Sequence, residues 1–199
     1  MNGDISVIIP THPGRSWELL GRAVKSVHDQ ILQPREVIIP QDVDHEGAGA
    51  TRSRGLFAAN GVYTAFLDSD DEFLPHHLST LHSVMSVDPD IIMAFTWFEA
   101  VGMPDPLGHF GLPFDPAHPH HTTVTTMVQT EVAWSVGGFP SGGEGSTAAC
   151  LNDDWIFLLK MCEYAVKYNK KIVHIPQRTW RYHGHQGNTS GKPTQGDAQ

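Results

Sequence analysis

The sequence contains little cysteine and no long apolar run. Cys150 and Cys162 are its only cysteines, too few for a framework of disulfides. No apolar stretch approaches the roughly 20 residues that a membrane-crossing helix needs. The opening segment MNGDISVIIP lacks the basic start and the small-residue cleavage site of a signal peptide. We therefore expect a cytoplasmic protein with reduced thiols and without a membrane span.

Basic residues are also scarce. The 13 Lys and Arg residues are outnumbered by 22 Asp and Glu residues, so the net charge is −9 with neutral histidines. This sign argues against a protein that binds nucleic acid or anionic lipid through bulk charge. Hydrophobic residues make up 40% of the 199 positions, which is enough for the core of one domain. We expect that domain over residues 1–190, followed by a polar, disordered tail over residues 191–199.

Short apolar runs alternate with segments of helical periodicity. The run Ile5–Pro10 is nearly all apolar, as expected for a strand buried on both faces, and 36–40 has the same character. The alternation predicts an α/β fold with a mixed, mostly parallel sheet flanked by helices. The predicted strands are 5–10, 36–40, 62–67, 90–95, 122–128, 172–175 and 178–182, and the predicted helices begin near Ser16, Gly47, Pro75 and Asp153. Two segments, 102–121 and 141–149, are predicted loops.

An acidic cluster follows the predicted strand 62–67. Asp68, Asp70 and Asp71 lie just past its carboxyl end, the edge at which open α/β sheets bind ligands. Crowded carboxylates repel one another unless a cation joins them, and their oxygens suit a hard divalent ion such as Mg²⁺ or Mn²⁺. Alternatively, Asp71 and Glu72 cap the next helix. Capping does not explain the spaced pair Asp68 and Asp70.

A second pair of carboxylates, Asp153 and Asp154, begins the last long helix. The positive end of a helix dipole stabilises such a pair, which is an adequate structural explanation. A carboxylate fixed beside a reacting hydroxyl can instead act as a general base. The sequence at this point leaves both interpretations open.

Basic side chains follow two other predicted elements. Arg52 and Arg54 come after the Gly-rich stretch 47–50 at a helix start, where backbone N–H groups and guanidinium together suit a diphosphate. His183 and His185 follow the last predicted strand, from which both imidazoles can reach one site. A single histidine of this kind is more often an ordinary surface or core residue.

Several of these motifs occur in a recognisable order. The segments are 6–11 (SVIIPT), 50–56 (ATRSRGL), 61–71 (GVYTAFLDSDD), 136–139 (VGGF), 153–155 (DDW) and 181–183 (RYH). Together they resemble the family 2 glycosyltransferases, whose single domain has the Rossmann-like GT-A fold. The resemblance covers residues 4–190.

The resemblance implies a hexosyltransferase-type reaction, in which a sugar moves with inversion from a nucleotide diphosphate donor to an acceptor hydroxyl. It implies Mn²⁺ or Mg²⁺ as cofactor. Asp68 and Asp70 match the family's Asp-x-Asp motif, and His183 matches a His that closes over the donor diphosphate, so these three residues are the implied metal site. A UDP-sugar is the favoured donor, and the acceptor is a glycan, a protein or a small molecule. The loops 102–121 and 142–149 would border the acceptor.

The resemblance also assigns the other site residues. Asp154 matches the carboxylate that acts as general base, and Asp153 stands where the family usually has Glu. Arg52 matches the Arg of the family's Ala-Arg-Asn segment, and Thr11 would line the nucleotide pocket. The implied nucleotide-binding set is Pro10, Thr11, Gln41, Asp42, Arg52, Asp68 and Ser69.

The chain departs from the family pattern after its second predicted strand. Gln41 replaces the first Asp of the usual Val-Asp-Asp-Gly-Ser segment, which weakens the implied contact with uracil. The stretch from there to Arg52 leaves no room for the additional strand of most members. Two other classes of function use the same features: a metal-dependent nucleotidyltransferase or phosphohydrolase, and a binder of nucleotide sugars or glycans without catalysis.

Overall fold

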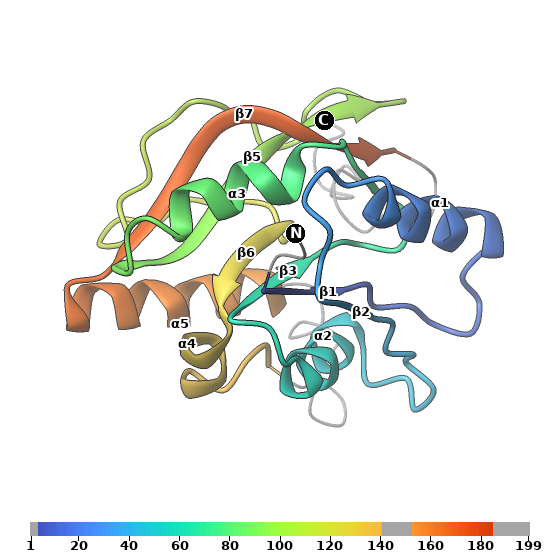
Figure 1. Cartoon of the computed structure of the whole chain (residues 1–199), viewed down its shortest axis with the longest axis horizontal. Helices are drawn as coiled ribbons and strands as arrows, with labels where there is room; N and C mark the ends of the chain where they lie inside the picture. Colours follow the sequence, from blue (N-terminus) through green and yellow to red (C-terminus); the bar gives the residue numbers. More distant parts are fainter. Residues whose placement is uncertain (1–3, 141–152, 185–199) are drawn as a thin grey trace, which may run out of the picture.

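The computed structural model describes residues 4–140 and 153–184, which form one layered α/β unit (Figure 1). A seven-stranded sheet has the order β2-β1-β3-β6-β5-β7-β4. The strands are β1 (Ile5–Ile8), β2 (Glu36–Ile38), β3 (Tyr63–Phe66), β4 (Glu72–Phe73), β5 (Ile91–Val101), β6 (Thr126–Gln129) and β7 (Lys171–His183). The helices are α1 (Trp17–His28), α2 (Ala48–Ala58), α3 (His77–Met85), α4 (Thr130–Ser135) and α5 (Asp153–Tyr168).

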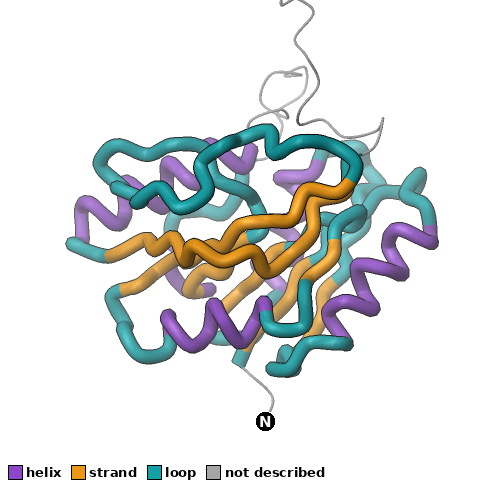
Figure 2. The backbone as a smooth tube through the Cα atoms, turned by 90° about the horizontal axis from the view of Figure 1, so that it is seen from above, coloured by secondary structure: helices purple, strands orange, loops and turns teal. Residues whose placement is uncertain are grey.

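The sheet is mixed, as the sequence predicts. β1 pairs in parallel with β2 and β3, and β5 pairs in parallel with β7. β6 is antiparallel to both of its neighbours, and β4 is antiparallel to β7. The strands run through the middle of the molecule with helices around them (Figure 2). Since Ile8 pairs with Phe66, β1 and β3 end at the same edge, and the segments that follow them emerge together.

Helix starts follow the predicted signals. The Ser16 hydroxyl accepts a hydrogen bond from the Glu18 N–H and caps α1, whose apolar stripe includes Ala23 and Val27. Gly47, with a φ of 95°, precedes α2. That helix is unusual because much of its surface is buried, including the polar side chain of Arg52. Its small residues allow neighbouring elements to approach closely, which matters for the site described below.

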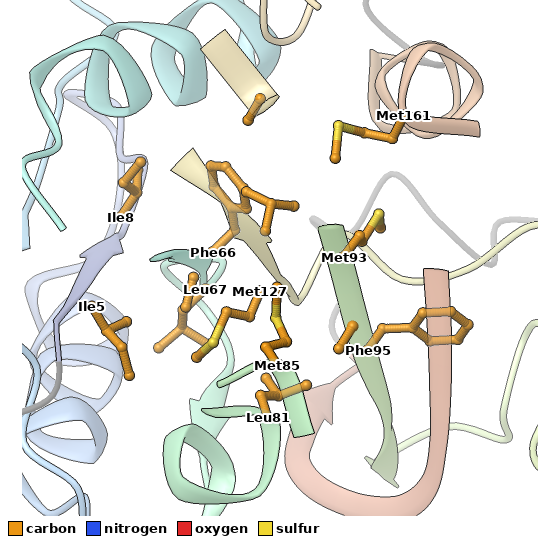
Figure 3. Packing of buried hydrophobic residues seen from close by; sticks show 14 of the residues in the cluster. Ile5, Ile8, Phe66, Leu67, Leu81, Met85, Met93, Phe95, Met127 and Met161 are labelled. Atoms are coloured by element: carbon orange, nitrogen blue, oxygen red, sulfur yellow. The ribbon is translucent and has the colours of Figure 1, made fainter. Parts of the chain in front are cut away.

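The core occupies both faces of the sheet (Figure 3). Leu81 and Met85 of α3 pack on one face near Met127. On the other face, Phe66 makes edge contacts with Phe139 and with Phe157 of α5, at ring-centroid distances of 5.1 and 6.2 Å. These contacts fix α5 against the centre of the sheet, and so they fix the position of its first residues.

Several predicted strands differ from the structure: β5 extends to Val101 and β6 begins only at Thr126, and the larger differences concern 36–40 and the two closing strands. The sequence predicts that 36–40 is buried on both faces, but β2 is an edge strand of partly exposed residues, and this prediction is wrong. An apolar run at a sheet edge looks like a central strand because sequence carries no information on strand order. The closing strands 172–175 and 178–182 are one continuous strand, β7. It bulges between His174 and Arg178, where its register with β5 shifts.

The structure also contains two short elements that the sequence did not predict, α4 and β4. In β4, Glu72 pairs with Arg181 of β7, and helix α3 begins only at His77. The alternative that Asp71 and Glu72 cap the next helix is therefore wrong.

A buried polar chain ties α3 to the sheet. The ring Nδ1 of His77 lies 2.6 Å from the Thr179 hydroxyl, which lies 2.6 Å from the Thr96 hydroxyl. The His77 ring also stacks on Phe73 at 4.0 Å. Burial, and secondly the charge of His76, lower the pKa of His77 to about 3. The imidazole is therefore neutral in the folded chain at neutral pH.

We expect His77 to make the folded state sensitive to acid. Its pKa is lower in the folded than in the unfolded chain, so unfolding takes up a proton below about pH 6.5. The free energy of unfolding should be unaffected by His77 above that pH and should fall by up to about 1.4 kcal/mol per pH unit towards pH 3. Urea titrations of the parent and His77→Gln should show a shallower acid decline in the variant. His28→Gln, which changes an exposed imidazole, should keep the parental slope; parallel profiles for the parent and His77→Gln would contradict this account.

Candidate active site

A cleft of about 590 Å³ opens at the edge where β1 and β3 end. The first wall comes from the loop after β1, the second from the acidic segment after β3, and the third from the start of α2 and the loop before it. The lining residues are Pro10, Thr11, His12, Pro13, Gly14, Arg15, Asp42, His45, Ala48, Thr51, Arg52, Asp68, Ser69, Asp70, Asp71 and Tyr182. Six of the seven residues predicted to bind the nucleotide line this one cleft, the exception being Gln41.

Each of the first two aspartates of the acidic cluster forms an ion pair with an arginine. Arg52 Nη2 donates to Asp68 at 2.6 Å, and Arg15 Nη1 donates to Asp70 at 2.9 Å. Asp71 is 2% exposed and accepts a hydrogen bond from the His183 backbone N–H at 2.9 Å. Burial, and secondly the charge of Asp68, raise the pKa of Asp71 well above its ordinary value. The cluster thus attracts cations through Asp68 and Asp70, whereas Asp71 serves to join the acidic loop to β7.

The donor chemistry of Asp68 and Asp70 fits a hard divalent cation. Both are carboxylates that line the cleft, and an arginine side chain already forms an ion pair with each of them. Within residues 4–140 and 153–184, no group of three or more His, Cys, Asp or Glu side chains is placed to hold a metal by itself. Mg²⁺ in proteins is commonly held by one or two carboxylates together with waters and substrate phosphates, so this pair can hold such an ion with waters or a phosphorylated ligand in the rest of its shell.

The predicted third ligand, His183, contacts Glu72 rather than the cleft. Its ring Nε2 is 3.5 Å from a Glu72 carboxylate oxygen, and its side chain is not among the cleft-lining residues. Burial, and secondly the positive Arg22, lower the pKa of His183 although Glu72 opposes this. Its role as a ligand stays a prediction.

The segment after β2 runs alongside the segment after β1. Thr11 forms a parallel bridge with Gln41, and the Asp42 N–H donates to the Thr11 carbonyl at 2.8 Å. The Asp42 carboxylate accepts the backbone N–H groups of Glu46 and Gly47, which shapes the loop that leads into α2. Asp42 therefore lines the cleft in a fixed orientation, whereas Gln41 is exposed.

Arg52 links the acidic cluster to the start of α5. The guanidinium donates to Asp68 and, at 3.2 Å, to Asp153, and it lies over the Phe139 ring at 5.6 Å. A Cβ on Gly49 would lie 2.6 Å from an Asp153 carboxylate oxygen, so only glycine lets α5 begin this close to α2. Burial raises the pKa of Asp153, and the charge of Arg52 opposes that shift. Asp153 is thus a buried partner of Arg52.

Asp154 occupies a different environment from its neighbour. Its carboxylate accepts the Trp155 N–H at 2.8 Å and lines a small hollow next to the loop that precedes β6. His121 of that loop stacks on Trp155 at a centroid distance of 4.2 Å. The two aspartates at the start of α5 therefore differ: Asp153 is engaged by Arg52, and Asp154 borders the predicted loop 102–121.

Three residues at the site, Arg15, Arg22 and Tyr182, were not predicted from the sequence. Arg15 and Tyr182 line the cleft, and Arg22 donates to the backbone carbonyl of Asp70. The available signal for Arg15 was its place directly after Pro13 and Gly14 in the loop that follows β1. Side chains in such a loop lie at the ligand-binding edge of the sheet.

Some predictions lie outside the described residues. They are the loop 141–149, the tail 191–199, and the residues Cys150 and His185. Cys162 is a buried free thiol, and burial raises its pKa to about 12. In the described part of the chain, no helix is long and apolar enough to cross a bilayer.

A stretch from β2 to β6 has a family match. Residues 38–128 match Glycosyl transferase family 2. The resemblance to family 2 glycosyltransferases is confirmed. The matched stretch contains Asp42, Arg52, Asp68 and Asp70, but it ends before the start of α5, so the role of Asp154 still depends on the resemblance described above.

Two curated relatives carry glycosyltransferase names. One, a putative colanic acid biosynthesis glycosyl transferase, WcaA, of Escherichia coli strain K12, is 36% identical over 73 residues. The other, the uncharacterized glycosyltransferase MJ1057 of Methanocaldococcus jannaschii, is 29% identical over 76 residues. The matches cover 37% and 38% of this chain, and 24% and 26% of those two proteins. The matched segment thus spans about a quarter of each curated relative.

Solved structures share the whole fold. The crystal structure of S. aureus TarS 1–349 in complex with UDP-GlcNAc matches with a TM-score of 0.73 and 16% identity, over 98% of this chain and 62% of TarS 1–349. The complex of TarS 1–349 with UDP matches with a TM-score of 0.69 and 16% identity, over 92% and 61%. At this identity the likeness concerns the fold alone, and it confirms the predicted GT-A fold.

Proposed function

We propose that this chain is the catalytic domain of a glycosyltransferase that moves a sugar from a nucleotide diphosphate donor to an acceptor hydroxyl. The observation that carries the proposal is the cleft at the ends of β1 and β3, in which Thr11, Asp42, Asp68 and Asp70 come together. The match of residues 38–128 to Glycosyl transferase family 2 supports the same reaction class.

The donor is proposed to be a UDP-sugar. Structures with the same fold bind UDP-GlcNAc and UDP. The nucleoside would lie beside Pro10, Thr11 and Asp42, at the joined ends of β1 and β2. The diphosphate would lie between the acidic cluster and the start of α2, since a helix N-terminus favours anions.

A divalent cation, Mn²⁺ or Mg²⁺, is part of the proposal. Asp70 and Asp68 would hold it together with diphosphate oxygens, and it would neutralise charge on the departing phosphates. His183, the predicted third ligand, would have to leave Glu72 to reach the same ion.

Asp154 is the proposed general base. The acceptor hydroxyl would attack the anomeric carbon from the face opposite the nucleoside diphosphate, and its proton would pass to the Asp154 carboxylate as the bond to the phosphate oxygen breaks. This single displacement inverts the anomeric carbon. Arg52 ties the start of α5 to Asp68, so the base is held at a fixed place relative to the donor cleft. The loop that carries His121 would border the acceptor.

A thermal-shift screen tests whether the cleft binds nucleotides. A ligand that binds only the folded state, present at 100 times its Kd, stabilises it by about 2.7 kcal/mol, which raises the Tm of a chain of this size by about 5–10 °C. We expect such a rise with UDP or a UDP-sugar, larger with Mn²⁺ than with EDTA. The absence of any rise in Tm with nucleoside diphosphates and nucleotide sugars at millimolar concentration would refute the proposal.

The cytoplasmic location expected from the sequence stays a prediction.

A further inference from the structure

We propose that Arg15 is a movable counter-ion of the cleft. It neutralises Asp70 while no metal ion is bound, gives up that carboxylate to a divalent cation, and then binds the diphosphate of the donor. The inference rests on the proposed function, because it needs a divalent cation and a nucleoside diphosphate in one cleft.

The position of Arg15 suits such an exchange. It lies in the loop between β1 and α1, in a turn closed by a 3.0 Å hydrogen bond from its N–H to the His12 carbonyl. Its side chain is 19% exposed and crosses to the acidic loop, where Nη1 donates to Asp70 Oδ2 at 2.9 Å. The residue therefore lines the cleft and spans from the first strand's loop to the predicted metal ligand.

The present pairing leaves Arg15 incompletely satisfied. Its Nε is buried and has no hydrogen-bond partner within the described residues. A guanidinium has five N–H donors in a planar fork, which matches the paired oxygens of a phosphate. A diphosphate in the cleft would therefore offer Arg15 paired oxygens, one of which could accept from the Nε that now has no partner.

Electrostatics makes the two cations compete. A divalent ion on Asp70 would bring a second positive group onto one carboxylate, and repulsion between the two favours departure of the guanidinium when the ion binds. The anion that arrives with the ion is the donor diphosphate. Arg15 then moves from a carboxylate to a phosphate in the same cleft and keeps a charge-assisted hydrogen bond in both states.

The two neighbouring arginines are less suited to this role. Arg52 is 7% exposed and is held by carboxylates from two elements, Asp68 and Asp153, so its departure would break the contact between α2 and α5. Arg22 donates to the backbone carbonyl of Asp70. Arg15 donates to the Asp70 carboxylate itself, from the loop that lines the cleft.

Titration calorimetry on Arg15→Gln tests the exchange in two steps. With Mn²⁺ alone, the variant should bind the ion about fivefold more tightly than the parent, because the guanidinium of Arg15 no longer competes for the Asp70 carboxylate. With saturating Mn²⁺, it should bind UDP about tenfold more weakly, because a diphosphate ligand is missing. A merely structural role for Arg15 would not move the two affinities in opposite directions.

Two further variants make the test specific. Arg35→Gln removes an exposed positive charge outside the cleft lining and should change the Mn²⁺ affinity by less than about twofold, since salt screens distant exposed charges. Arg15→Lys, which keeps the charge, should restore most of the UDP affinity. If the parent binds Mn²⁺ and UDP but Arg15→Gln binds both like the parent, the inference about Arg15 is wrong and the proposed function stands. If neither protein binds Mn²⁺ or UDP, the proposed function fails and this inference fails with it.

Discussion

Asp154→Asn should turn over at least about a hundredfold more slowly than the parent, because general-base catalysis is typically worth about 10²–10⁴-fold in rate. The substitution keeps the shape of the side chain and an oxygen that can accept the Trp155 N–H, but it removes the proton acceptor. Asn also caps helices about as well as Asp. The variant should therefore melt near the parent and bind donor and metal as the parent does.

Donor hydrolysis to free sugar and nucleoside diphosphate can serve as the assay until an acceptor is identified. Glu131→Gln is a matched control, because Glu131 is also a carboxylate in a first helical turn, that of α4. It should leave turnover unchanged. Parental turnover by Asp154→Asn on a true acceptor would remove Asp154 from the mechanism, and Asp153→Asn would be measured next. That variant should also lose stability, since Arg52 is buried against Asp153.

Asp70→Asn should abolish the contribution of Mn²⁺ to donor binding. Even outer-shell partners of a metal contribute about 10–100-fold to metal affinity, so loss of a direct ligand should cost at least tenfold. The fold should persist, because the substitution relieves repulsion among three nearby carboxylates, which offsets the weakened part-buried contact with Arg15. Calorimetric titration of UDP with Mn²⁺ and with EDTA should give two different affinities for the parent and nearly equal affinities for the variant.

Asp44→Asn is the control for that experiment. Asp44 is an exposed carboxylate in the loop before α2 and is not among the lining residues, so this variant should keep the parental response to Mn²⁺. If Asp70→Asn binds UDP with the parental metal dependence, Asp70 is not a metal ligand.

Local signals in the sequence were sufficient for most of the fold. The first residue of α5 agrees with the predicted helix start, because the acidic pair at Asp153 precedes residues of helical periodicity. The acidic cluster lies at the end of β3, as its position after an apolar run predicted. Both signals are contained in a few consecutive residues.

Features that depend on distant residues were not predictable. β4 consists of Glu72 and Phe73, and it exists because Arg181 and Trp180 of β7 supply its partners. The position of β2 at the sheet edge could not be predicted, since it depends on the order of the strands in the sheet. Pro176 made β7 look like two strands, but the shift of register with β5 accommodates the interruption.

The site also combines residues that local signals predicted with contacts between distant residues that they did not. Thr11, Asp42, Asp68 and Asp70 follow strand ends, so the rule for open α/β sheets already placed them together. The pairing of Arg52 with Asp153 joins residues 101 positions apart, and it depends on how closely α2 and α5 approach at Gly49. The sequence gives no measure of such an approach.

The products formed from the donor show whether the cleft supports glycosyl transfer from a nucleotide sugar. The chain is incubated with a UDP-sugar and Mn²⁺, and the products are separated by anion-exchange chromatography and identified by ³¹P NMR. We expect UDP and free sugar in equal amounts from the parent, and at least about a hundredfold less from Asp154→Asn. Release of pyrophosphate or inorganic phosphate, or binding of the donor without any turnover, would contradict this expectation.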